Sequence, residues 1–85
     1  MTKPLKVFGG CFDGSHRWVV AAKSMNAAIN IWREYDARLS ASYARNHASE
    51  TGNETECNIA LSNPGKVYRC GTHYPKIYTI IEKKS

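Results

Sequence analysis

The sequence predicts an α+β domain with an antiparallel sheet, and three observations lead to that fold class. Segments rich in β-branched and aromatic residues lie near both ends of the chain. A segment without glycine or proline fills the middle, between Ser24 and Thr51. The expected order along the chain is β-β-α-α-β-β. This order favours an antiparallel sheet with the helices packed on one face.

The chain is short enough to form only one domain. It has 85 residues, of which 42% are hydrophobic and 22% are charged, as in ordinary globular proteins. Residues 1–85 are therefore predicted to share one compact core. Domains of this size are often stabilised by association, so we expect a homo-oligomer.

Two N-terminal strands are expected, over 5–8 and 17–22. The pair Gly9-Gly10 is expected to end the first strand. A wide, glycine-rich connection then spans 9–16 and contains the turn pair Asp13-Gly14. Together the two strands predict a β-hairpin.

The first helix is predicted to begin after Ser24, because serine commonly caps helix N-termini. Its apolar residues recur at spacings of three and four, which places them on one face: Met25, Ala28, Ile29, Trp32, Tyr35 and Leu39. The helical pattern reaches about His47. A break is nevertheless expected near Ser40 to Ser42, because serine side chains compete for backbone hydrogen bonds.

A shorter helix is predicted over 54–62. Asn53 and Glu56 have the spacing of a capping box, as do Thr51 and Glu54. Its buried stripe is expected to comprise Cys57, Ala60 and Leu61. The segment Asn63-Pro64-Gly65 ends it.

Two C-terminal strands are predicted, over 66–70 and 76–81, with 71–75 connecting them. This hairpin interleaves aromatic and basic residues: Lys66, Tyr68, Arg69, His73, Tyr74, Lys76 and Tyr78. Tyr68 and Tyr78 are expected to face each other across it. Aromatic rings stack on bases and cations hold phosphates, so Tyr68 and Arg69 are candidate ligand-binding residues. Tyrosine is also common in ordinary strands.

The net charge of +5 favours binding to polyanions or to acidic protein surfaces. The basic residues are dispersed, so the charge is also that of a generic solubilising surface. We find no signal peptide and no apolar run long enough to span a membrane. The odd number of cysteines, three, predicts free thiols and a cytoplasmic protein.

The glycine-rich connection is the first candidate ligand site. Backbone amides in turns bind anions, and arginine forks onto phosphate. The candidate ligand-binding residues here are Gly9, Gly10, Asp13, Gly14, His16 and Arg17. The segment lacks a Gly-Lys-Ser/Thr sequence and leads into a strand, which excludes a Walker loop and a dinucleotide fingerprint. A hairpin that needs glycine for positive φ is the alternative explanation.

Three further features of the sequence bear on function. Two cysteine–histidine pairs, Cys11/His16 and Cys70/His73, have ligand types suited to zinc but match no standard finger. No catalytic motif is present, so we expect neither an enzyme nor a cofactor. Two helices carrying Arg33, Arg38 and Arg45 would suit helix-turn-helix DNA binding, although the short glycine-containing turn of that motif is missing.

Five segments resemble a group of very small bacteriophage accessory proteins: Val7-Phe8-Gly9-Gly10, Phe12-Asp13-Gly14-x-His16-Arg17, Val20-Ala21-Ala22-Lys23-Ser24, Ser49-Glu50-Thr51-Gly52-Asn53 and Pro64-Gly65-Lys66-Val67-Tyr68-Arg69. The resemblance spans most of the chain and implies no activity. It implies stoichiometric binding in a host cytoplasm, either to block a host enzyme or to sequester a nucleotide signal used in antiphage defence. The sequence thus leads first to a binder of an anionic nucleotide-like molecule. A protein inhibitor of a host defence enzyme and a DNA- or RNA-binding accessory factor are the alternatives.

Overall fold

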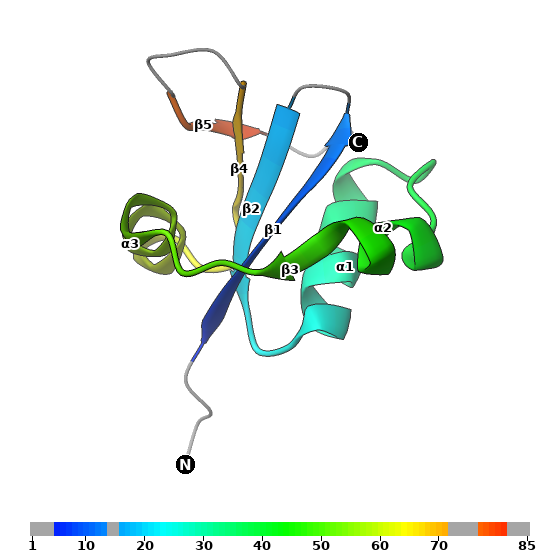
Figure 1. The fold of residues 1–85 in the computed structure, drawn as a ribbon, viewed down its shortest axis with the longest axis horizontal. Coiled ribbons are helices and arrows are strands. Elements are labelled where there is room, and N and C mark those ends of the chain that lie inside the picture. Colours follow the sequence, from blue (N-terminus) through cyan, green and yellow to red (C-terminus); the bar gives the residue numbers. More distant parts are fainter. Residues whose placement is uncertain (1–4, 14–15, 72–76, 82–85) are drawn as a thin grey trace.

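The computed structural model describes residues 5–13, 16–71 and 77–81. Within them the chain forms one five-stranded antiparallel sheet and three helices (Figure 1), which confirms the α+β class. The elements are β1 (Lys6–Asp13), β2 (His16–Ala22), α1 (Met25–Tyr35), α2 (Ala41–His47), β3 (Ala48–Glu50), α3 (Glu54–Ser62), β4 (Val67–Cys70) and β5 (Thr79–Ile81). The strand order across the sheet is β3-β1-β2-β4-β5.

The hairpin of β1 and β2 forms the centre of the sheet, and its first strand is longer than predicted. Gly9 and Gly10 lie inside β1 rather than in a loop, and the ladder is irregular only between Cys11 and Asp13. The reason is that β1 is paired on both sides. Gly9 lies opposite Val19 of β2 and Ser49 of β3, so two ladders hold the glycine pair in an extended conformation. The short strand β3 was not predicted.

The helical middle of the chain is broken, as expected, but the first helix ends earlier than predicted, at Tyr35, so Leu39 lies outside it. Ser24 accepts a hydrogen bond from the backbone N–H of Ala27 and begins α1. Ser40 begins α2 in the same way, by accepting from the N–H of Tyr43 at 3.1 Å. A capping serine therefore separates two helices that the apolar pattern alone would join.

The helices cover both faces of the sheet, which corrects the prediction that they pack on one face. In Figure 1, α1 and α2 lie on one side of the sheet and α3 lies on the other. Phe8, Trp18 and Val20 pack beneath α1 and α2. The physical reason is the continuous apolar run at the end of β2, which exposes alternate residues on both faces, and both must be buried. Val19 and Ala21 accordingly pack with Ala60 of α3.

The face of α3 that meets the sheet differs from the predicted stripe. Ala60 is buried and Cys57 is half-buried, but Leu61 is 45% exposed. Glu56 occupies the buried position instead, with an exposed fraction of 3%. A carboxylate at this depth requires strong partners, because desolvation opposes its charge.

The C-terminal hairpin has a different register from the one expected. Tyr68 lies opposite Ile80, so it does not face Tyr78, which precedes β5. The predicted connection over 71–75 lies mostly outside the described residues, as does the start of the predicted strand over 76–81.

Candidate functional site

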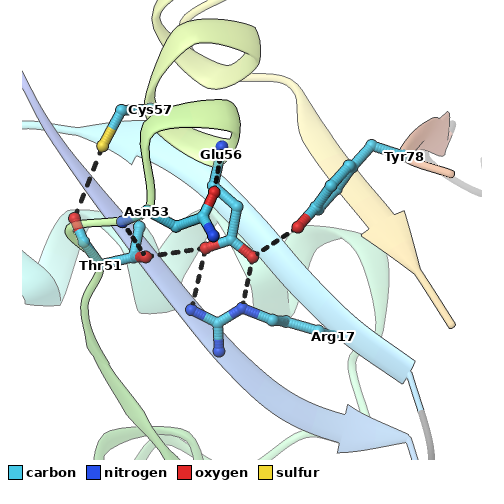
Figure 2. Close-up of polar contacts among 6 residues, drawn as sticks. All are labelled: Arg17, Thr51, Asn53, Glu56, Cys57 and Tyr78. Carbon is cyan, nitrogen blue, oxygen red and sulfur yellow. Dashed lines mark hydrogen bonds and ion pairs between the residues drawn. The ribbon is translucent and has the colours of Figure 1, made fainter. Parts of the chain in front are cut away.

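A partly buried ion pair joins the centre of the sheet to α3 (Figure 2). Arg17 Nε donates to Glu56 Oε2 at 2.7 Å, and Arg17 Nη2 donates to Glu56 Oε1 at 3.1 Å. This is the bidentate geometry in which arginine binds carboxylates most strongly. The pair links two elements that are far apart in the sequence.

The capping box of α3 explains how Glu56 reaches the sheet. Asn53 accepts a hydrogen bond from the backbone N–H of Glu56 at 3.0 Å, as its N-cap position predicts. In a complete box the carboxylate would return to the N–H of Asn53. Here Thr51 Oγ1 accepts that hydrogen bond at 3.1 Å. The carboxylate of Glu56 is thereby left to pair with Arg17.

Two hydroxyl groups complete the surroundings of the carboxylate. Thr51 donates to Glu56 Oε1 at 2.8 Å and Tyr78 donates to Glu56 Oε2 at 2.9 Å. Each oxygen thus accepts one hydrogen bond from Arg17 and one from a hydroxyl. A carboxylate with four hydrogen bonds from the protein can stabilise the fold but is poorly placed to accept a proton from a substrate.

The hydrogen bonds outweigh the effect of burial on the protonation of the cluster. Burial alone would raise the pKa of Glu56, but hydrogen bonds from Arg17, Thr51 and Tyr78 and the charge of Arg17 lower it below its usual value. The hydrogen bond to Glu56 raises the pKa of Arg17. Burial, together with the neighbouring Glu56, raises the pKa of Tyr78. The ion pair is therefore charged at neutral pH.

Gly9 makes room for the guanidinium. A Cβ placed on Gly9 would lie 2.5 Å from Arg17 Nη2 and 2.8 Å from Arg17 Cζ, closer than real Cβ contacts allow. The guanidinium therefore lies directly over the backbone of β1. At this position glycine is required by a close approach and not by a turn.

The outer edge of the guanidinium faces away from the carboxylate. In Figure 2 its third nitrogen points away from Glu56, and 29% of the Arg17 side chain is exposed. Cys11 lies opposite Arg17 on one neighbouring strand and Cys70 on the other. Cys11 is exposed and Cys70 is buried. Arg17 is thus a partly exposed cation whose Nε and Nη2 are fixed by Glu56 and whose third nitrogen points away from that carboxylate.

The predicted binding residues are only partly brought together. Gly9 and Arg17 lie together, whereas Gly10 follows Gly9 in the strand and faces the opposite side of the sheet. His16 begins β2 opposite Asp13, and Gly14 lies outside the described residues.

The two candidates on β4 are separated by the alternation of the strand. Tyr68 is buried on the α3 side, where its hydroxyl accepts a hydrogen bond from Asn63 at 2.7 Å. Arg69 lies opposite Trp18 in the ladder and on the other face of the sheet. Tyr68 and Arg69 therefore do not form one ligand surface.

Sequence reasoning missed the residues that hold Arg17. Glu56, Thr51 and Tyr78 were not candidates, although the capping-box spacing had drawn attention to Glu56 and Thr51 as helix-capping residues. That spacing does not reveal that the Glu56 side chain leaves the cap. The proximity of Tyr78 depends on tertiary structure alone.

The predicted zinc ligands are not assembled within the described part of the chain. There, no group of three or more metal-binding side chains occurs. Cys11 and Cys70 are separated by the strand that carries Arg17, and His73 lies outside the described residues.

Comparisons with known proteins supply no relative. No protein-family model, no curated protein and no solved structure matches the chain. Among the described residues, no helix has the length and apolar character needed to span a membrane.

Proposed function

We propose that the protein is a small, non-catalytic binding protein that captures an anionic, nucleotide-type ligand at the outer edge of Arg17. The observation that carries this proposal is the guanidinium of Arg17, which is fixed by Glu56 although its side chain is partly exposed. Two hydrogen bonds to Glu56 hold its inner side, while its third nitrogen points away from that carboxylate. A preorganised arginine binds phosphate or carboxylate without losing side-chain freedom at that moment.

The polarity of the ion pair supports anion binding. The negative end is Glu56, which is 3% exposed, whereas the positive end is 29% exposed. The exposed end of the pair is therefore positive. The net charge of +5 adds a weak long-range attraction for anions.

The same cluster favours binding over catalysis. All four hydrogen bonds to Glu56 come from groups of the protein itself, so its carboxylate is not poised as a general base. The half-buried Tyr78, fixed by its hydroxyl, stands beside the pair (Figure 2) and supplies an aromatic surface for a base. In the setting implied by the resemblance to phage accessory proteins, this binder would act as a homo-oligomer that sequesters a nucleotide signal in the host cytoplasm.

A titration of nucleotides by isothermal calorimetry tests the proposal. The panel contains mono-, di- and cyclic nucleotides and inorganic phosphate, with Arg17→Lys and the control Arg38→Lys. Lysine at position 17 keeps the charge but loses the fork geometry. We expect at least one nucleotide to bind the wild type and Arg38→Lys equally, and Arg17→Lys at least about tenfold more weakly, which is about 1.4 kcal/mol. Equal binding by all three proteins would refute the site.

One observation favours a second function, inhibition of a host protein by direct contact. Ile77 and Ile80 are 66% and 49% exposed, and Ile80 belongs to β5, the last strand in the order of the sheet. Exposed apolar side chains beside a sheet edge favour a protein partner. Replacing both with serine would abolish co-purification of a host enzyme under this function and leave nucleotide binding unchanged.

A further inference from the structure

The outer surface of α1 and α2 carries two arginines that form hydrogen bonds with neutral acceptors and, among the described residues, no ion pair. Arg33 Nε donates to the backbone oxygen of Leu39 at 3.0 Å, and Arg45 Nη2 donates to Asn26 Oδ1 at 2.6 Å. Both acceptors are neutral. Within the described part of the chain, neither guanidinium lies at ion-pair distance from a carboxylate, whereas Arg38 pairs with Asp36 at 3.2 Å.

These two hydrogen bonds place positive charge near both ends of α1. Asn26 lies in the first turn of α1 and Arg33 in the last. The two positions are seven residues apart, so they share one face of the helix and are separated by roughly 10 Å along its axis. Arg45, held at Asn26, and Arg33 are therefore two fixed cations in a row.

The other flank of α2 carries an exposed aromatic pair. The rings of Tyr43 and His47 are stacked, with centroids 4.0 Å apart and an interplanar angle of 19°. His47 Nδ1 donates to the backbone oxygen of Tyr43 at 2.9 Å, which fixes the orientation of the imidazole. Tyr43 is 44% exposed, so part of this rigid aromatic surface faces solvent.

The geometry of α2 places the rings and the arginine on opposite flanks of one narrow ridge. Residues 43 and 45 are about 200° apart around the helix, and Ala44 between them is buried against the core. The crest of the ridge carries Ser42 and Asn46, which are small, polar and exposed. An extended chain can therefore cross the ridge closely and contact both flanks.

We propose that this surface binds single-stranded nucleic acid, with phosphates on Arg33 and Arg45 and an unstacked base on the Tyr43–His47 pair. Phosphate contacts from arginine together with stacking on exposed rings are the two components of single-strand recognition. A base inside a duplex is already stacked and cannot use the aromatic pair. This site is separate from the Arg17 cluster and does not depend on the function proposed there.

Fluorescence anisotropy with labelled oligothymidylate, oligouridylate and a duplex of equal length tests the proposal on the full chain. We expect single strands to bind more tightly than duplex at about 50 mM salt. The logarithm of the binding constant should fall with log salt with a slope of about −1.4, corresponding to two phosphates at −0.7 each. Arg33→Gln/Arg45→Gln should bring that slope close to zero. Tyr43→Leu should weaken binding roughly tenfold without changing the slope.

Lys66→Gln, which removes an exposed charge outside these helices, serves as the control that keeps wild-type binding. Urea unfolding of each variant establishes that it is folded. Three outcomes would overturn the proposal: no binding of single strands by the wild type, wild-type binding by both the double variant and Tyr43→Leu, or equal binding of duplex and single strands with no effect of Tyr43→Leu. The last result would indicate contact with duplex phosphates alone.

Discussion

Replacing Arg17 with methionine should destabilise the protein much more than the same substitution at an exposed arginine. The variant leaves Glu56, 3% exposed, with its two hydroxyl donors but without its counter-ion. Removing one partner of a buried pair costs about 3–5 kcal/mol. We expect about 3 kcal/mol, at the lower end, because Arg17 is partly exposed and two hydrogen bonds to the carboxylate remain.

That loss is large compared with the total stability. A domain of this length has a free energy of unfolding of about 4–13 kcal/mol. At about 4–8 °C per kcal/mol, Arg17→Met should lower Tm by about 12–24 °C. Glu56→Gln should cost less, about 1–2 kcal/mol, because the arginine that it leaves behind can be hydrated.

Urea unfolding followed by tryptophan fluorescence measures these differences. Trp18 and Trp32 are both buried in the core between α1 and the sheet, so their emission reports global unfolding. Arg38→Met is the matched control, since the Arg38 side chain is 91% exposed, and it should cost less than about 1 kcal/mol. If Arg17→Met lowers the free energy of unfolding by less than about 1 kcal/mol, with an unchanged m-value, the view that this ion pair stabilises the packing of α3 on the sheet is refuted.

Three further predictions concern the cluster of Arg17 and Glu56 and the two cysteines that lie opposite Arg17 on the neighbouring strands. The pKa of Glu56 is lowered in the folded state, so the stabilising effect of its charge should be complete above the usual pKa of 4.5 and be lost as the pH falls through the lower folded value. Urea midpoints measured across this pH range should therefore decline more for the wild type than for Glu56→Gln. Gly9→Ala should cost about 1–2 kcal/mol in the wild type by displacing the guanidinium, but little in Arg17→Met, as a double-mutant cycle will show. Cys11, which is exposed, should react with a thiol reagent first, and buried Cys70 only upon unfolding; a fast second thiol assigned to Cys70 by mass spectrometry would contradict its burial.

Local features of the fold could be predicted because their causes are local. The capping serines Ser24 and Ser40 and the capping spacing of Asn53 and Glu56 are visible in the sequence, and α1, the break before α2, and α3 lie where those residues place them. The capping interaction needs only neighbouring residues. The helical part of the prediction therefore needed no tertiary information.

The errors arose where tertiary contacts override local preference. Gly9 and Gly10 are typical of a turn, but pairing with two neighbouring strands keeps them in β1. The placement of helices on both faces was indicated by the run Val19-Val20-Ala21-Ala22 in β2, whose members alternate between the two faces. The sequence analysis predicts only a strand over 17–22, in a sheet with helices on one face.

The candidate site shows the same limit. Arg17 was a candidate for its chemistry, but its close approach to Gly9 was not predicted, because the sequence analysis places Gly9 in the connection and not in β1. Its partner Glu56 is 39 residues away, and no short spacing reveals such a contact. That Glu56, and not Leu61, lies on the buried face of α3 becomes recognisable only when the second face of the sheet is known to be covered by this helix.

Side-chain NMR of the arginines during titration with the tightest-binding nucleotide tests the central claim most directly. The account predicts that the Arg17 Nη resonances shift on binding. The Arg17 Nε–H resonance should stay near its position, because Nε remains bound to Glu56 at 2.7 Å in the free protein. Saturable shifts at Arg17 Nη would establish the Arg17 guanidinium as the binding group. Shifts confined to other arginines, or no shifts with any nucleotide, would contradict it.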